Sequence, residues 1–280
     1  MKLLLLTAAA LVGFAANSLL TRSALGAGQI DAATFTAVRL LTGALTLAAI
    51  TRVRGGTSTD ARGSWASSLW LAGYAVSFTL AYTRIGASVG ALVLFGCVQL
   101  TMIGAGVIAG ERPGRIDWVG LALAASGLLT LTLPGVTAPD PIGLLLMVLA
   151  GVCWGLYSLA GRRSADPLGT TAGNFARAAL FGVLFFLVRF PSRFITSSGL
   201  GLAAASGSLA SGVGYTFWYA ALPALPAWRA AVLQLTVPVL TALSAAVLLH
   251  EPVTARLLVA TALIAGGVAI TSWPAWHRAR

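Results

Sequence analysis

Apolar stretches of membrane-spanning length alternate with short polar segments along the whole chain. A helix that crosses about 30 Å of hydrocarbon needs roughly 20 mostly apolar residues. The sequence predicts ten such helices, at residues 3–21, 32–51, 65–83, 86–109, 118–134, 142–160, 168–188, 199–222, 226–249 and 256–274. The intervals at 83–86 and 222–226 are so short that the flanking helices join almost directly. The pattern therefore predicts an all-α integral membrane protein with ten transmembrane helices.

The first stretch, MKLLLLTAAALVGFAANSLL, has two interpretations. A single lysine, an apolar run and small residues such as Gly13 and Ala15 are typical of a cleaved secretory signal peptide. The same composition also suits a helix that stays in the membrane. A counterpart of this segment further along the chain would favour the second interpretation.

Composition predicts that the whole chain lies in lipid. Hydrophobic residues make up 58% of the 280 residues and charged residues only 9%, whereas a soluble domain carries roughly 25% charged residues. The formal net charge of +11 would also suit a nucleic-acid partner, but the basic residues are spread between apolar stretches and form no dense patch. We therefore expect a lipid bilayer and no nucleic acid. Cys97 and Cys153 lie inside apolar stretches, so they predict neither a disulfide nor a metal site.

The distribution of Lys and Arg predicts the orientation in the membrane. If the N-terminus is cytoplasmic, ten basic residues face the cytoplasm and five face outward, while Arg39, Arg177 and Arg229 lie inside spans. Positive residues favour cytoplasmic loops. We therefore predict a multi-pass protein of the bacterial inner (cytoplasmic) membrane with both termini in the cytoplasm.

The two halves of the chain resemble each other at a spacing of 140 residues. LLLLTAAALVGFAANSLLTR (3–22) matches GLLLMVLAGVCWGLYSLAGR (143–162) at eight of twenty positions. The opening stretch therefore has a counterpart that cannot be a leader, which favours a retained helix. Because five helices are an odd number, the second half enters the membrane from the opposite side. The sequence thus predicts two inverted-topology five-helix repeats, residues 1–138 and 139–280, a plan typical of secondary transporters.

Glu and Pro recur in the turns after the fourth and ninth predicted helices, as GERP (110–113) and HEPV (250–253). With ten helices and a duplicated five-helix unit, the chain resembles the drug/metabolite transporter superfamily, EamA type, over essentially its whole length. Within that group it is most similar in overall likeness to YddG-type bacterial exporters of aromatic amino acids. The resemblance implies a central cavity formed mainly by helices 1, 3, 4, 6, 8 and 9, with helices 5 and 10 at the periphery.

No acidic residue lies in the middle of a predicted span. The seven are Asp31, Asp60, Glu111, Asp117, Asp140, Asp166 and Glu251. Without a buried carboxylate, carboxylate-based proton coupling is disfavoured, and we expect a facilitator or an exchanger driven by the substrate gradient. Because the sequence offers no paired-carboxylate, HExxH or Ser–His–Asp arrangement, we expect no enzyme activity, no catalytic residue, no metal and no cofactor.

Aromatic residues at helical spacing are candidates for a substrate cavity. Residues four apart share a helix face, as Tyr74, Phe78 and Tyr82 do. The candidates for binding a flat apolar group are Phe14, Phe78, Tyr82, Trp154, Tyr157, Tyr215, Trp218 and Tyr219. The structural alternatives are ordinary packing and the aromatic belt at the membrane interface.

Polar side chains within spans are candidates for orienting the polar end of a substrate. Asn17 and Gln99 are amides in lipid, and Arg177 lies near the middle of the seventh predicted helix. An arginine at mid-bilayer costs roughly 2.5–3.5 kcal/mol on insertion scales, so it should face protein or water. Arg39 has the same two interpretations as Arg177: a carboxylate-binding cation, or a structural partner for carbonyl groups. Interhelical hydrogen bonds alone would also account for the amides.

Pro238 lies inside the ninth predicted helix. A proline within a span frees a carbonyl group and permits a bend. Pro238 is therefore a candidate gating residue, with a static kink as the alternative.

Together these features predict an inner-membrane exporter of amino acids, aromatic or broadly neutral ones, which acts by alternating access around a midplane cavity. The expected partners are a small-molecule substrate and the bilayer, and a monomer is favoured. A transporter of another metabolite or drug of the same superfamily is the nearest alternative. A non-transporting membrane scaffold or a lipid-modifying protein is the alternative from another class.

Overall fold

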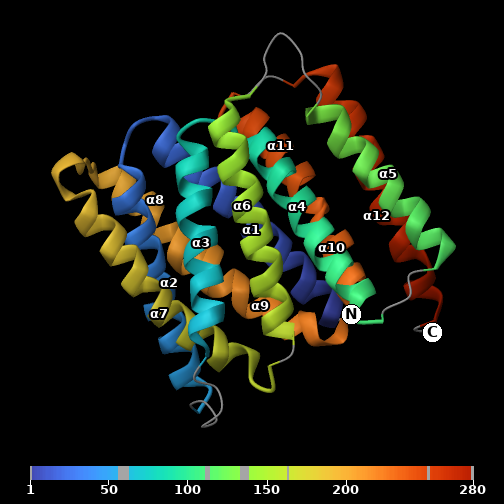
Figure 1. Cartoon of the computed structure of the whole chain (residues 1–280), viewed down its shortest axis with the longest axis horizontal. Helices are drawn as coiled ribbons and strands as arrows, with labels where there is room; N and C mark the ends of the chain where they lie inside the picture. Colours follow the sequence, from blue (N-terminus) through green and yellow to red (C-terminus); the bar gives the residue numbers. More distant parts are fainter. Residues whose placement is uncertain are drawn as a thin grey trace.

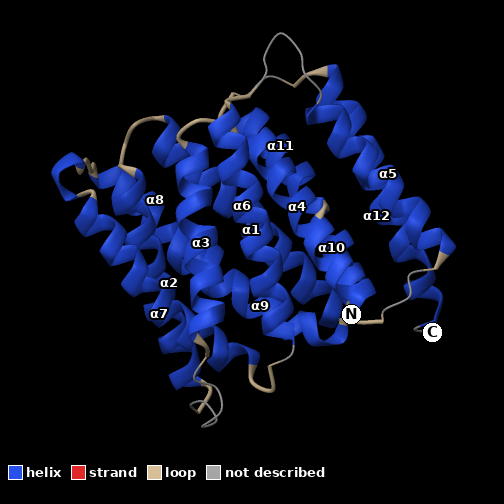
Figure 2. Ribbon diagram, viewed as in Figure 1, coloured by secondary structure: helices blue, strands red, loops and turns tan. Residues whose placement is uncertain are grey.

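The computed structural model describes residues 2–55, 63–110, 114–132, 139–162, 164–250 and 253–278, and its regular structure is helical (Figures 1 and 2). The α-helices are α1 (Lys2–Gly26), α2 (Ala32–Val53), α3 (Trp65–Tyr82), α4 (Ala87–Ile108), α5 (Arg115–Thr132), α6 (Pro141–Arg162), α7 (Pro167–Val188), α8 (Ser197–Ala205), α9 (Gly214–Ala221), α10 (Ala227–Gln234), α11 (Thr236–Leu248) and α12 (Ala255–Arg278). Shorter helical segments are η1 (Phe190–Ser192), η2 (Ser206–Val213) and η3 (Leu222–Ala224). The all-α prediction is confirmed for the described residues.

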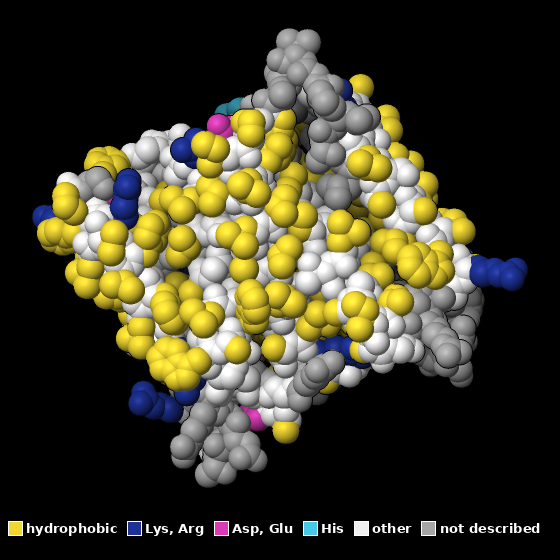
Figure 3. Space-filling view, in the orientation of Figure 1, with side chains coloured by type: hydrophobic (Ala, Val, Ile, Leu, Met, Phe, Trp, Pro, Cys, Tyr) yellow, Lys and Arg dark blue, Asp and Glu magenta, His cyan; other side chains and the backbone are white. Residues whose placement is uncertain are grey.

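Within the part of the chain that the structure describes, six helical segments are long and apolar enough to cross a membrane. They are Leu3–Gly26, Ala32–Val53, Ala87–Ile108, Pro141–Arg162, Pro167–Val188 and Arg229–Leu248. Apolar side chains cover much of the face seen in Figure 3, and Leu45 and Leu100 are each 70% exposed. Soluble monomers rarely expose so large an apolar surface, so this surface suits lipid. Helical structure is present at each of the ten predicted stretches; that all ten span the bilayer stays a prediction.

The eighth and ninth predicted stretches are not uniform helices. In the eighth, α8 passes into the π-helical segment η2 and then into α9. The sequence of η2, SGSLASGV, is rich in Ser and Gly, which stabilise a regular α-helix poorly. In the ninth, α10 ends at Gln234 and α11 begins at Thr236. Pro238 has no N–H for the carbonyl of Gln234 four residues earlier, which explains the break at this position.

Helices from the two halves of the chain pack against each other. The pairs include α5 with α12, α2 with α7, α3 with α6, and α1 with α9. In Figure 1, α1 begins at the edge where the N-terminus is marked, whereas α6 begins at the opposite edge. These two helices therefore run through the molecule in opposite senses (Figure 1), and the inverted repeat of the two halves stays a prediction. The boundary between residues 138 and 139 stays a prediction, and residues 133–138 lie outside the described ranges.

The α1–α2 loop and the segment before α8 form a clasp between the halves. The Asp31 N–H donates to the carbonyl oxygen of Phe194 at 2.8 Å, and the Thr196 N–H donates to that of Gln29 at 2.8 Å. The Asp31 carboxylate also accepts from the Phe194 N–H at 3.0 Å. We call residues 29–31 and 194–196 the loop clasp. Asp31 is in addition the N-cap of α2, so one side chain starts a helix and joins two loops.

A second tie between the halves lies at the N-terminus of α3. The Ser64 N–H donates to Asn174 Oδ1 of α7 at 2.8 Å. Gly63, with φ of +70°, packs against the same amide, where a Cβ atom would collide with Asn174. The N-terminus of α3 is therefore fastened to α7 in this structure.

The loop clasp should weaken at acid pH. Partial burial raises the pKa of Asp31, but hydrogen bonds from Thr34, Phe194 and Ala33 outweigh it and hold the pKa below its ordinary value. Because the unfolded pKa is about 3.9, this stabilisation is complete above about pH 4 and is lost as pH falls through the folded pKa. We expect D31N to lower the thermal unfolding midpoint at pH 7. The gap between wild type and D31N should close below about pH 4.

D166N is the matched control for this measurement. Asp166 caps α7 by accepting from the Gly169 N–H at 3.0 Å, a bond within one helix. D166N should therefore lower the unfolding midpoint less than D31N at pH 7. A gap between wild type and D31N that persists unchanged at pH 3 would contradict the role given to the Asp31 carboxylate.

Candidate functional site

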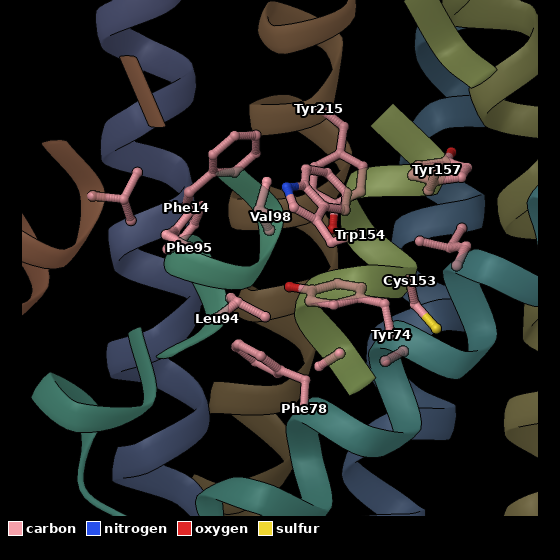
Figure 4. Packing of buried hydrophobic residues seen from close by; sticks show 14 of the residues in the cluster. Phe14, Tyr74, Phe78, Leu94, Phe95, Val98, Cys153, Trp154, Tyr157 and Tyr215 are labelled. Atoms are coloured by element: carbon pink, nitrogen blue, oxygen red, sulfur yellow. The ribbon is translucent and has the colours of Figure 1, made fainter. Parts of the chain in front are cut away.

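Aromatic side chains from four helices meet near the centre of the molecule (Figure 4). Phe14 of α1 lies edge-on to Trp154 of α6, with ring centroids 5.4 Å apart, and edge-on to Tyr215 of α9 at 5.8 Å. Tyr74 of α3 packs against Trp154 at 5.2 Å, and Tyr215 does so at 4.8 Å. Edge-to-face and tilted arrangements are the favoured geometries of aromatic pairs. We call these four buried residues the aromatic cluster.

A small cavity lies against the aromatic cluster. Its lining comprises Phe14, Asn17, Ser18, Tyr74, Phe78, Leu94, Phe95, Trp154 and Tyr215. The centre of a water molecule can occupy about 10 Å³ of this cavity, which is room for about one water. The rings therefore close the cavity in this structure, and a larger molecule could enter only if the surrounding helices separated.

A chain of polar side chains borders the aromatic cluster and joins the two halves. Arg39 donates from Nη2 to the Tyr74 hydroxyl oxygen at 3.1 Å and from Nε to Ser211 Oγ at 3.2 Å. Asn17 donates from Nδ2 to the same Tyr74 oxygen at 3.1 Å. Ser206 donates to Asn17 Oδ1 at 2.7 Å, which fixes the amide orientation. We call these five residues the polar chain.

Arg39 is a buried cation with no carboxylate partner among the described residues. Arg39 is 1% exposed, and its Nη1 makes no hydrogen bond to the described part of the chain. The guanidinium lies 5.1 Å from the ring centroid of Tyr74 and 5.2 Å from that of Phe78, so cation–π attraction offsets part of its lost hydration. Asp31, which caps the same helix, is eight residues or about 12 Å away. The polar chain therefore carries a positive charge that no acidic side chain of the described residues neutralises.

The π-helical segment η2 supplies both serines of the polar chain. π-helical turns are frequent at functional sites. Here the segment brings Ser206 to Asn17 and Ser211 to Arg39. The apolar pattern does not single out these serines. The available signal is SGSLASGV itself, a polar run that weakens a helix in the middle of an otherwise apolar stretch.

Trp154 also connects the aromatic cluster to the break between α10 and α11. Its Nε1–H donates to Gln234 Oε1 at 2.8 Å, and Gln234 Nε2 lies 3.4 Å from the sulfur of Met102. Gln234 is the last residue of α10 and the position whose carbonyl Pro238 leaves free. The helix is interrupted between Gln234 and Thr236; bending and movement at Pro238 stay predictions.

The structure brings most of the predicted site residues together. Five of them line the cavity: Phe14, Asn17, Phe78, Trp154 and Tyr215. Three others belong to the same buried set around it. Trp218 lies 5.5 Å from Phe14, and Tyr157 lies 5.8 Å from Trp154 and 5.7 Å from Tyr219.

The remaining three predicted binding residues do not line the cavity. Tyr82 packs on Phe78 at 4.7 Å near the end of α3, and Gln99 is buried on α4 away from the cavity lining. Arg177 donates to the carbonyl of Gly173 at 3.1 Å in its own helix, and its guanidinium lies 5.5 Å from the Trp65 ring. Arg39, not Arg177, is thus the arginine beside the cavity.

The described residues contain no group of three or more His, Cys, Asp or Glu side chains that could hold a metal ion. Cys97 and Cys153 are free thiols. Glu111 and Glu251 of the two Glu–Pro turns lie outside the described residues.

The described part of the chain is helical, its outer surface is apolar, and a closed polar and aromatic cavity lies between its halves. These features define a polytopic membrane protein built around this cavity. The profile of the EamA-like transporter family matches residues 141–273. PA1977 of Pseudomonas aeruginosa is 49% identical over 99% of this chain and 96% of its own length. Residues 141–273 thus carry an EamA-like transporter family domain of the drug/metabolite transporter superfamily. This domain points to a transporter-type function rather than to an enzyme.

Two further comparisons bear on the class and the fold. The inner membrane transporter YedA of Escherichia coli K12 is 27% identical over 49% of this chain and 43% of its own length. A solved structure titled "Crystal structure of protein" superposes with a TM-score of 0.77 at 23% identity, covering 97% of this chain and 98% of that one. The predicted EamA resemblance is confirmed as a domain over residues 141–273, and the narrower likeness to YddG-type exporters stays a prediction.

Proposed function

We propose that the protein is a bacterial inner-membrane secondary transporter that exports amino acids, above all aromatic or neutral ones, by alternating access around the central cavity. The observation that carries the proposal is the aromatic cluster beside the buried guanidinium of Arg39. Aromatic rings bind a flat apolar side chain, and a guanidinium binds a carboxylate through paired N–H donors. One site thus offers a surface for each end of an aromatic amino acid.

Alternating access fits the arrangement of the helices. In the proposed topology, residues 1–138 and 139–280 are inverted repeats of five membrane spans each, both termini are cytoplasmic, and the protein acts as a monomer. Helices α2 and α7, and likewise α5 and α12, would then be equivalent helices that pack on each other. The cavity takes its lining from both halves, and ties hold the halves together at the loop clasp and at the N-terminus of α3. A closed cavity of this kind suits an occluded intermediate between two open states.

The alternatives differ in how well they explain Arg39. A scaffold or a lipid-modifying protein gains no stability from a buried cation without a counterion, because desolvation of the charge is costly. A transporter of another metabolite or drug would use the same cavity, and only a substrate panel separates it from an amino-acid exporter.

Counterflow in proteoliposomes tests the proposal. Vesicles loaded with one unlabelled amino acid should take up the same labelled amino acid with saturable kinetics, and phenylalanine, tyrosine and tryptophan should give the highest rates. Because no carboxylate among the described residues lines the cavity, the rates should be the same with and without a pH gradient. Protein-free vesicles are the control.

Two outcomes would count against the proposal. Folded, reconstituted protein that exchanges none of the twenty amino acids is not an amino-acid transporter. A rate that rises several-fold with the pH gradient would overturn the uncoupled mechanism and leave the substrate assignment intact.

A further inference from the structure

We propose that Asn17 Nδ2 and the guanidinium of Arg39 form a carboxylate site, and that this site selects aromatic monocarboxylates of net charge −1 over zwitterionic amino acids and over amines. The inference deepens the proposed function and rests on it in one respect, the binding of the transported molecule in the central cavity. It departs from that function in the charge of the preferred ligand.

The geometry around the Tyr74 hydroxyl indicates where the carboxylate binds. Asn17 Nδ2 and Arg39 Nη2 both donate to this single neutral oxygen, each at 3.1 Å. Charge-assisted hydrogen bonds from an arginine to a carboxylate are shorter, about 2.7–2.9 Å. Tyr74 and Asn17 both line the cavity, so an incoming carboxylate reaches this position when the cavity opens. In the closed structure the Tyr74 oxygen occupies the place of one carboxylate oxygen.

The guanidinium has capacity for the second carboxylate oxygen. Its Nη1 makes no hydrogen bond to any described residue, although Arg39 is almost wholly buried. Unpaired N–H groups of a buried guanidinium are costly. The Nη1 and Nη2 groups form one edge of a planar fork that matches the two oxygens of a carboxylate. Binding in this way would satisfy Nη1 and replace a phenol oxygen by a stronger acceptor at Nη2.

The charge balance sets the preference among ligands. The polar chain holds one positive charge, and no acidic side chain of the described residues lines the cavity. A monoanion neutralises that charge. A zwitterion supplies the same carboxylate but also brings an ammonium group, for which the lining offers only neutral acceptors and aromatic faces. An amine adds a second cation beside Arg39, and like charges in a water-poor site repel strongly.

Three ligands of matched shape test this preference. 3-Phenylpropionate, phenylalanine and phenethylamine share a phenyl ring on a two-carbon chain and carry net charges of −1, 0 and +1. Their dissociation constants can be measured by calorimetry on the purified full-length protein in lipid nanodiscs. We expect the dissociation constant of 3-phenylpropionate to be at least about tenfold lower than that of phenylalanine. Phenethylamine should show no saturable binding. Equal affinity for the amine and the carboxylate would overturn the proposal.

The two arginines within spans provide a matched pair of variants. R39M should weaken 3-phenylpropionate binding at least about 30-fold, as expected when one partner of a buried ion pair is lost, and R39K should lie between R39M and wild type. R177M should bind like wild type, because Arg177 bonds within its own helix and packs on Trp65. Equal losses in R39M and R177M would contradict the assignment to Arg39.

Y74F keeps the proposal testable if R39M does not fold. Removing the hydroxyl frees both donors, so folded Y74F should bind 3-phenylpropionate more tightly than wild type. Loss of binding in folded Y74F would show that the hydroxyl contacts the ligand and does not compete with it, against the proposal.

The failures of the two proposals are separable. If the protein exchanges 3-phenylpropionate but none of the amino acids, only the amino-acid function is refuted. If it exchanges amino acids and R39M binds 3-phenylpropionate as tightly as wild type, only the carboxylate site is refuted.

Discussion

Replacing Trp154 by Ala should lower the saturable exchange rate about 100-fold, which corresponds to roughly 2.7 kcal/mol. The ring centroids of Phe14, Tyr74 and Tyr215 lie 4.8–5.4 Å from that of Trp154. The substitution leaves these rings without a common neighbour and removes a face of the cavity. Loss of a large buried aromatic side chain costs about 3–5 kcal/mol in protein cores, so the unfolding midpoint should fall as well. Initial counterflow rates per amount of monodisperse reconstituted protein measure the effect on transport.

W154F separates the ring from its hydrogen bond. Phe keeps an aromatic face toward its neighbours but leaves Gln234 Oε1 without the donor that now lies at 2.8 Å. An unsatisfied buried acceptor costs about 1–3 kcal/mol. We therefore expect W154F to lower the exchange rate about tenfold, between wild type and W154A. Normal exchange by W154A would refute the placement of the substrate in this cavity.

The apolar pattern predicted the helices well because length and composition are local properties. The stretch at residues 3–21 corresponds to α1, which packs against α9 and carries Phe14 and Asn17 to the cavity. The pattern did not predict where a helix changes geometry. The π-helical turns of η2 depend on how its serines and glycines meet α1 and α2, which is a tertiary property.

The choice between Arg39 and Arg177 shows the same limit for the site. The two arginines are 138 residues apart, near the repeat spacing, and both lie within spans. Depth in the span favours Arg177 as the arginine of the substrate site, but depth does not determine the direction in which a side chain points. In the structure Arg177 turns back to Gly173 of its own helix, whereas Arg39 reaches Tyr74 and Ser211. Only the packing of α2 on η2 makes these partners available to Arg39.

That packing predicts a large effect for a single methyl group at Gly207. A Cβ atom there would collide with the carbonyl oxygen of Arg39 and the hydroxyl of Thr42 and would lie 3.0 Å from the Arg39 carbonyl carbon. Because Arg39 presents backbone atoms, α2 could relieve the collision only by moving as a whole. Overpacking of this kind costs about 1–3 kcal/mol. We expect G207A to lower the thermal unfolding midpoint of the purified protein by several degrees.

G201A is the matched control, since a Cβ atom at Gly201 in α8 meets no atom within 4 Å. The same methyl group there should leave the midpoint unchanged or raise it slightly, because Ala is a better helix former than Gly. Midpoints of G207A and G201A that agree within error would mean that α2 and η2 are not in close contact, and the bond between Arg39 and Ser211 would then lose its support. If the contact holds, G207A should also weaken 3-phenylpropionate binding, because the displaced backbone is that of Arg39 itself. A stability defect at Gly207 that leaves this binding unchanged would separate the packing of α2 from the position of the guanidinium.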